Sequence, residues 1–168
     1  QVHPWLLRRP AYELWVAGST RGGKPPAIVR RLEAAGRVRL FLNQADLDPL
    51  YREAAVFVNP MLHGVSVKLK TLDAICRGLP VVSGAAGLDG AGLEPGKHVL
   101  LAEGGVAMAE AIARLLDAPS ERHALVQAAQ AFLARTYDQK ANLERLLAPA
   151  PRPASQEPVA SICEEPCD

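Results

Sequence analysis

The sequence has little of the features that mark several specialised classes of protein. Its 19 basic residues are almost balanced by 18 acidic ones, which leaves a formal net charge of +1. A generic nucleic-acid-binding protein needs a basic surplus to displace counterions, so the charge argues against that class. No apolar run reaches the roughly 18 residues that a transmembrane helix needs. The first ten residues include the basic pair Arg8-Arg9 after a short apolar stretch, which is not the pattern of a signal peptide.

Cysteine and aromatic residues are also scarce. The three cysteines are an odd number, so a disulfide framework is not expected and the predicted location is the reducing cytoplasm. Cys76 lies in an apolar helical run and is expected to behave as a small hydrophobe. A metal site built on Cys163 and Cys167 would lack two of its ligands, so no metal site is predicted. The pair Trp5 and Trp15 is expected in the core.

What the sequence does contain is the balance of a globular domain. Hydrophobic residues make up 49% and charged residues 22% of the chain, enough to form a core without disulfides. Five apolar runs of four to six residues are interpreted as strands that are covered on both faces, as in a parallel sheet. These runs are residues 12–17, 38–42, 55–59, 79–83 and 98–101.

Helical patterns separate and follow these strands. They cover residues 26–35, 47–54, 67–77, 107–116 and 120–136. Asp46 is a candidate N-cap, and Gly78 is a typical helix stop. The alternation predicts an α/β domain with a doubly wound, Rossmann-like, mostly parallel sheet flanked by helices. This domain is expected to span residues 1–147, and residues 148–168 form a proline-rich segment that is expected to be disordered.

The loop at residues 59–66 is the most informative place for chemistry. In a doubly wound sheet, ligands bind at the carboxyl ends of the strands, and this loop leaves one strand to feed the helix with Lys68. A glycine-bearing loop at a helix N-terminus favours an anion. A lysine there opposes the helix dipole, which makes sense if its partner is a phosphate. Asp73 can accept hydrogen bonds from ribose hydroxyls. A solvated Lys–Asp helix face explains the same local pattern equally well.

Residues 64–83, GVSVKLKTLDAICRGLPVVS, carry a resemblance to a known family. They resemble the nucleotide-sugar signature of GT-B glycosyltransferases of the family-4 type, roughly G-x-G-x-K-x-K-x-L-E-A-x-A-x-G-x-P-V-V. The similarity continues upstream through residues 41–58 and downstream through residues 87–100, and it covers about residues 5–147. Several spaced motifs in the right order make it specific.

The resemblance implies a role for each matching residue. Gly64, Val65 and Ser66 would offer backbone N–H groups to the donor diphosphate and sugar, and Lys68, the residue assigned to catalysis, would contact the diphosphate. Asp73 stands where the family has a ribose-binding glutamate and is one methylene shorter. The remaining positions lie around the nucleotide. Asn43 and Gln44 fall in the base-binding loop, Thr71 and Leu72 flank the helix face under the ribose, and Gly18 and Ser19 line the opposite loop.

Three departures from the family pattern are visible. Many relatives have a glutamate where this chain has Val65, and its absence points to a subfamily. Ser66 replaces a glycine and restricts the approach of the backbone slightly. The third departure is larger: nothing before Pro10 matches the family's first strand, and the N-terminal domain that holds the acceptor is not in this sequence.

The implied function is that of a donor-binding domain of a retaining glycosyltransferase. It would take a UDP- or GDP-sugar as donor and need no cofactor or metal, because Lys68 and the helix dipole neutralise the departing diphosphate. The acceptor, a sugar, lipid or polysaccharide, would reach it through the N-terminal domain, and the protein could associate with the inner membrane face. The isolated chain is expected to bind nucleotide weakly without turnover. The alternative is a non-catalytic or remnant domain that binds a nucleotide or another protein.

Other polar residues carry weaker patterns. Residues 19–24 are glycine-rich and basic but lack the Walker spacing, so a mobile surface loop is the better interpretation. His63 is expected to pack in its loop. No Gly-x-Gly-x-x-Gly motif follows a strand, which excludes a Rossmann oxidoreductase.

Overall fold

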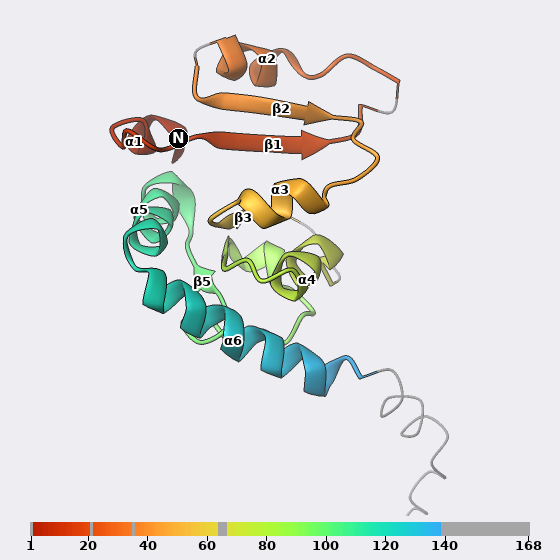
Figure 1. Cartoon of the computed structure of the whole chain (residues 1–168), viewed down its shortest axis with the longest axis vertical. Helices are drawn as coiled ribbons and strands as arrows, with labels where there is room; N and C mark the ends of the chain where they lie inside the picture. The colour runs from red at the N-terminus through yellow and green to blue at the C-terminus, as the bar shows by residue number, and fades with distance from the viewer. Residues whose placement is uncertain (1, 21, 35, 64–66, 139–168) are drawn as a thin grey trace, which may run out of the picture. The chain divides into compact units, whose positions relative to one another are not determined.

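Helices and parallel strands alternate along the chain in the computed structural model, which describes residues 2–20, 22–34, 36–63 and 67–138. The α/β class is confirmed (Figure 1). The strands are β1 Leu14–Gly18, β2 Val38–Leu42, β3 Phe57–Asn59, β4 Val81–Ser83 and β5 Leu100–Leu101. The helices are α1 Val2–Leu6, α2 Ala27–Ala34, α3 Asp48–Glu53, α4 Leu69–Cys76, α5 Gly104–Asp117 and α6 Pro119–Thr136, with a 3-10 turn η1 at Ala85–Gly87.

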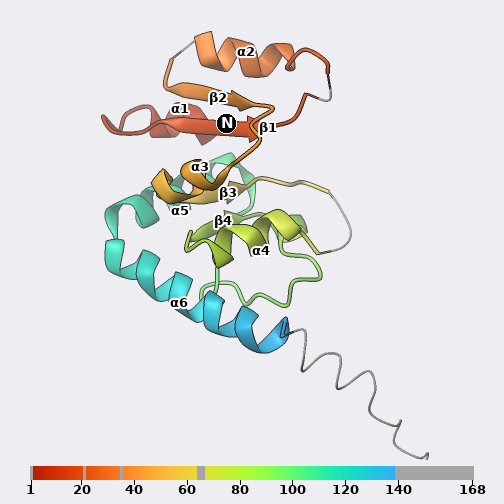
Figure 2. The ribbon, with the colours of Figure 1, turned by 45° about the vertical axis from the view of Figure 1, so that its right-hand side comes forward.

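The five strands form two parallel sheets, whereas the sequence predicted one. In the first sheet, β1 pairs with β2 from Leu14↔Val38 to Gly18↔Leu42. The second has the order β3-β4-β5. Paired strands lie about 4.8 Å apart. Among the described strands, β1 pairs only with β2 and β3 pairs only with β4, so each has one edge without a partner strand. Figures 1 and 2 show β1 as the strand of its pair nearer to β3. The break therefore lies between these two strands.

The hydrophobic core forms on both faces of β4. Val81 belongs to a cluster with Ile75 of α4 and Leu133 of α6. Val82, the next residue, belongs to a second cluster with Leu6 of α1 and residues of α5. Successive side chains of a strand point to opposite faces, so β4 is covered on both sides, as its apolar sequence predicted.

Three details of side-chain placement correct the sequence analysis. Helix α1 was not predicted, and it buries Leu6 at 2% exposure while the neighbouring Trp5, expected in the core, is 52% exposed. Cys76, expected to behave as a small hydrophobe, is exposed, next to Ile75 at 1% exposure. Successive helix positions point about 100° apart, so burying one residue turns its neighbour outward. Trp15 is half-buried.

The helix ends also differ from the sequence prediction. Helix α4 begins at Leu69, which makes Lys68 its N-cap residue instead of a residue of the first turn. Helix α5 begins at Gly104, three residues before the expected start. The N-cap position of α3 is Leu47, but Asp46 still acts as a capping acceptor because its Oδ1 accepts the N–H of Asp48 at 2.8 Å.

Two compact units divide the chain at Thr136. The first spans Gln1–Thr136, and the second spans Tyr137–Asp168, of which Tyr137 and Asp138 are described. The domain end predicted at residue 147 and the segment 148–168, with Cys163 and Cys167, lie outside the described residues.

Candidate functional site

The loops after β1 and β2 are joined by the side chain of Asn43. Its Oδ1 accepts the backbone N–H of Thr20 at 2.9 Å and lies 3.3 Å from the hydroxyl of Ser19. Its own backbone N–H donates to the carbonyl of Gly18 at 2.9 Å. Asn43 has a φ of 54°, a left-handed conformation that asparagine tolerates better than most residues. The structure thus brings together Gly18, Ser19 and Asn43, three of the predicted site residues.

Gln44, the other predicted base-loop residue, is exposed. Its Nε2 donates to the carbonyl of Leu42 at 3.4 Å, two residues back in the chain. It stands beside Asn43 at the end of β2, with its amide at the surface.

The N-terminus of α4 forms the second part of the site. Lys68 has an extended backbone, with φ −91° and ψ 92°, and no side-chain cap hydrogen bond is made there. Its carbonyl accepts the N–H groups of Thr71 at 2.8 Å and Leu72 at 3.3 Å, which starts the helix. The residue is buried, at 9% exposure. A basic side chain is therefore held against the protein at the positive end of a helix dipole, where negative charge is favoured.

Thr71 and Leu72 support this helix from inside. Thr71 is fully buried, and its hydroxyl accepts from Nδ2 of Asn59 at 2.9 Å and donates to the carbonyl of Gly87 at 3.2 Å. Leu72 packs against the core cluster of α4 and α6. From the sequence, Thr71 and Leu72 were predicted to flank the helix face under the ribose. In the structure Thr71 lies beneath that helix face, within the protein.

Sequence reasoning missed three residues of this internal network. Asn59 and Ser83, the last residues of β3 and β4, are 2% and 0% exposed. The Ser83 hydroxyl lies 2.9 Å from the carbonyl of Gly84 and 3.3 Å from that of Asn59. Gly87 lies so close that a Cβ there would come 2.7 Å from Nδ2 of Asn59. The signal available in the sequence was a polar residue at the end of each of two apolar strands.

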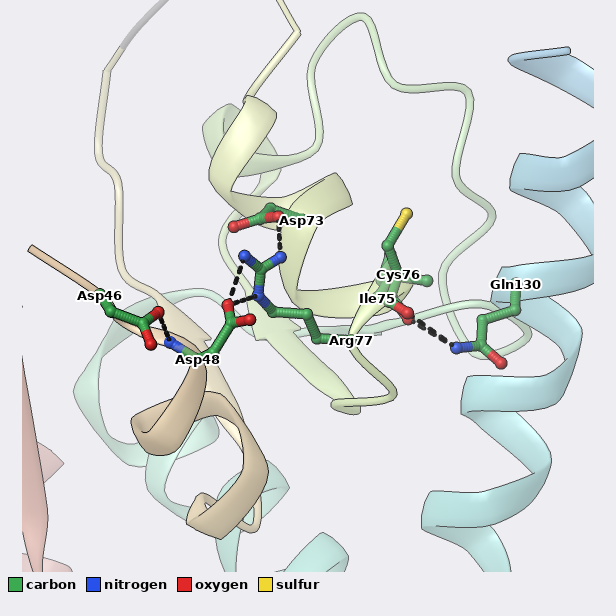
Figure 3. A network of polar contacts seen from close by, with 7 residues as sticks. All are labelled: Asp46, Asp48, Asp73, Ile75, Cys76, Arg77 and Gln130. Atoms are coloured by element: carbon green, nitrogen blue, oxygen red, sulfur yellow. Dashed lines mark hydrogen bonds and ion pairs between the residues drawn. The ribbon is translucent and has the colours of Figure 1, made fainter.

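Asp73 lies further along α4 and contacts Arg77 (Figure 3). Its Oδ1 is 2.6 Å from Nη1 of Arg77, and its side chain is 44% exposed. The nearby Tyr51 of α3 has a raised pKa, first because of burial and then because the Asp73 carboxylate disfavours a second negative charge. The predicted ribose acceptor is therefore half-exposed and already holds a cation.

The two parts of the site lie at the same end of the strands. The carboxyl ends of β1 and β2 and the N-terminus of α4 face the same side in both views (Figures 1 and 2). That is the edge where ligands bind in open α/β sheets. Gly64, Val65 and Ser66 lie outside the described residues, and His63 before them is exposed.

Two other histidines, His98 and His3, make contacts within the fold. Nδ1 of His98 accepts the backbone N–H of Glu94 at 3.0 Å, and its ring stacks on Phe132 with centroids 4.7 Å apart. Burial lowers the pKa of His98. His3 lies 3.2 Å from the hydroxyl of Tyr12. In the part of the chain that the structure describes, no helix is long and apolar enough to cross a membrane.

Known structures share this fold. The chain matches Anabaena Alr3699/HepE, solved with UDP, with a TM-score of 0.71 and 19% identity, covering 86% of this chain and 43% of that one. It also matches the sucrose-phosphate synthase of Thermosynechococcus elongatus with a TM-score of 0.64 and 26% identity, covering 86% of this chain and 40% of that one. Both likenesses support the Rossmann-like half of a GT-B fold.

Sequence comparisons agree with the structural ones. An uncharacterized 44.6 kDa protein in the cps region of Klebsiella pneumoniae is 29% identical over 145 residues, which are 83% of this chain and 37% of that protein. The chain thus spans about two fifths of the length of its relatives. The model of the family described as "Glycosyl transferases group 1" matches residues 1–118, so the chain belongs to the group 1 glycosyltransferases.

Proposed function

We propose that this chain binds the nucleotide-sugar donor of a retaining glycosyltransferase, with a UDP- or GDP-sugar as the substrate. The observation that carries the proposal is Lys68, which is buried at the N-terminus of α4. Lysine and helix dipole together favour a diphosphate at this place. A solved relative of the same fold was crystallised with UDP-glucose, which supports a nucleotide sugar as the ligand.

The proposed chemistry is the stabilisation of charge on the leaving group. The bond between the anomeric carbon and the diphosphate oxygen breaks, the acceptor oxygen forms the new bond to that carbon, and its proton passes to the departing diphosphate. The leaving diphosphate gains negative charge in the transition state, and Lys68 and the α4 N-terminus would stabilise it. This arrangement needs no metal or cofactor. The acceptor, a sugar, lipid or polysaccharide, would be bound by a part of the whole protein that this chain does not cover.

The remaining residues would surround the nucleoside and the sugar. Asn43 and Gln44 would meet the base, Gly18 and Ser19 would line the opposite side, and Asp73 would accept hydrogen bonds from the ribose. Backbone N–H groups of Gly64, Val65 and Ser66 would approach the diphosphate and sugar. Thr71 and Leu72 would act indirectly, by holding α4 against the loop that contains Gly87.

A thermal-shift assay with matched lysine variants tests this function. The chain is unfolded with UDP, GDP and ADP and their sugars. A ligand at about 100 times its dissociation constant adds roughly 2.7 kcal/mol, which raises the midpoint by several degrees in a domain of this size. Lys68→Ala should abolish the shift. Lys70→Ala, which removes the same charge from an exposed position on the same helix, should retain it.

The opposite results would reject the proposal. A chain that unfolds cooperatively with no shift from any of these nucleotides does not bind the donor. An equal loss of the shift in Lys68→Ala and Lys70→Ala would mean that general positive charge, and not the α4 N-terminus, attracts the nucleotide.

A further inference from the structure

Arg77 joins two helices through their carboxylates. It is the C-cap residue of α4, and its Nη1 lies 2.6 Å from Oδ1 of Asp73, four residues earlier on the same helix. Its Nη2 and Nε lie 2.7 and 3.1 Å from Oδ1 of Asp48 on α3. The guanidinium also stacks over the ring of Tyr51, 4.8 Å from its centroid. Figure 3 shows the guanidinium between the two carboxylates.

This geometry is more than an isolated surface ion pair. One exposed pair restrains its side chains weakly, but here a planar group is held by two acceptors and an aromatic face at once. Arg77 is therefore held on two sides, and it restrains Asp73 more than a single ion pair would. An aspartate has only two side-chain torsions, so a single fixed ion pair is enough to set where its carboxylate points.

Asp73 can still bind a ligand in this state. Its side chain is 44% exposed, and an ionised carboxylate offers about four lone-pair sites, of which Arg77 uses part. A ribose hydroxyl can donate to the same carboxylate while Arg77 keeps it in place.

The network also reaches the loop after β2. Asp48, which holds Arg77, has its backbone N–H bonded to Oδ1 of Asp46 at 2.8 Å. Asp46 follows Asn43 and Gln44, the residues proposed to meet the base. A chain of contacts thus runs from the proposed base loop through α3 and Arg77 to the proposed ribose acceptor (Figure 3).

We infer that Arg77 is a positioning residue for ribose recognition: it holds the Asp73 carboxylate in the orientation that accepts the nucleotide's ribose hydroxyls. This inference rests on the proposed function, because it needs a nucleotide at α4. It assigns to Arg77 the discrimination of ribonucleotides from deoxyribonucleotides and leaves the diphosphate to Lys68.

The test compares two probes that differ by one hydroxyl. The affinities of UDP and 2′-deoxy-UDP, or of the GDP pair if GDP gives the larger thermal shift, are measured by calorimetry on the 168-residue chain. A hydrogen bond to a charged acceptor should make the ribonucleotide bind about tenfold more tightly. In Arg77→Ala this preference should fall to near one, because the ribonucleotide is weakened and the deoxynucleotide is not. Asp73→Asn should behave in the same way.

Three further variants separate positioning from general damage. Arg77→Lys should restore part of the preference, since an ammonium reaches Asp73 but cannot hold two carboxylates in one plane. Asp48→Asn, which releases Arg77 without touching Asp73, should also reduce the preference. Arg114→Ala removes a comparable exposed pair, Arg114 with Glu121 at 2.6 Å, and should change neither affinity. Thermal midpoints confirm that each variant is folded.

The experiment distinguishes failure of the positioning role of Arg77 from failure of the proposed function. If Arg77→Ala keeps the tenfold preference, weakens both probes equally or binds the ribonucleotide more tightly, the positioning role is refuted while the donor site stands. If the wild-type chain binds neither probe, the proposed function itself fails and this inference fails with it.

Discussion

Substituting Gly87 by alanine should disturb the polar network that holds the start of α4. A Cβ at this position would lie 2.7 Å from Nδ2 and 3.0 Å from Cγ of Asn59, and closer still to the hydroxyl oxygen of Ser83. Both neighbours are buried, at 2% and 0% exposure. Neither is the free end of a flexible chain, so the methyl group cannot be accommodated by a small movement at the surface.

The expected loss of stability depends on which buried groups must move to make room for the new methyl group. Overpacking a close-packed interior costs about 1–3 kcal/mol. If Ser83 or Asn59 rotates away, a buried polar group loses its partner, which costs about 1–3 kcal/mol more. Alanine lowers the conformational entropy of the unfolded chain, but this stabilises the folded protein by only about 0.4–1 kcal/mol. We therefore expect a loss of about 1–5 kcal/mol, equivalent to roughly 3–15 °C in the melting midpoint of a domain of this size.

Urea and thermal unfolding of four variants measure this effect: Gly87→Ala, Gly18→Ala, Ser83→Ala and the double variant Gly87→Ala/Ser83→Ala. Gly18→Ala is the matched control, because a Cβ at Gly18 meets no atom within 4 Å, and it should change the midpoint little. Ser83→Ala removes the hydroxyl nearest to the new methyl group. The double variant should therefore be more stable than the sum of the single effects predicts. A Gly87→Ala midpoint equal to that of Gly18→Ala would refute the close packing at η1.

Two further predictions concern other parts of the fold. Because burial lowers the pKa of His98, the unfolded chain takes up a proton near the ordinary pKa of about 6.5 while the folded chain does not. The free energy of unfolding should therefore keep its full value above about pH 6.5 and decrease as the pH falls below it. In urea unfolding measured from pH 8 to 5, His98→Gln should reduce this pH dependence. In α1, Leu6→Ala should lower the free energy of unfolding by about 2 kcal/mol or more. Trp5→Ala, at an exposed position, should change it by less than about 0.5 kcal/mol in the same experiment. Equal losses from the two α1 variants would contradict the orientation of that helix.

Local signals in the sequence predicted most of the elements and their order. The strand Val38–Leu42 has the predicted bounds. Helix α2 is shorter than predicted by one residue at each end, and α6 begins one residue earlier than predicted. In each case an apolar pattern and a nearby breaker determine the element, and both can be read within about ten residues. Strand ends were less predictable. Residues 55–58 are all apolar, yet β3 begins only at Phe57, because its ladder depends on where β4 pairs.

The distant partners of the site side chains could not be read in this way. Asp73 was predicted as a ligand-binding carboxylate from its place in a motif. Its partner Arg77 lies four residues further along the same helix, but the second carboxylate that holds Arg77, Asp48, is 29 positions away from Arg77 in the sequence. Thr71 was placed beside the ribose for the same reason, and its burial depends on Asn59 and Gly87. A motif places a residue on an element, but the packing of other elements decides which of its atoms remain available to a ligand. This is why the distant partners that orient the predicted site, Asn59, Gly87 and Asp48, are the ones that only the folded chain identifies.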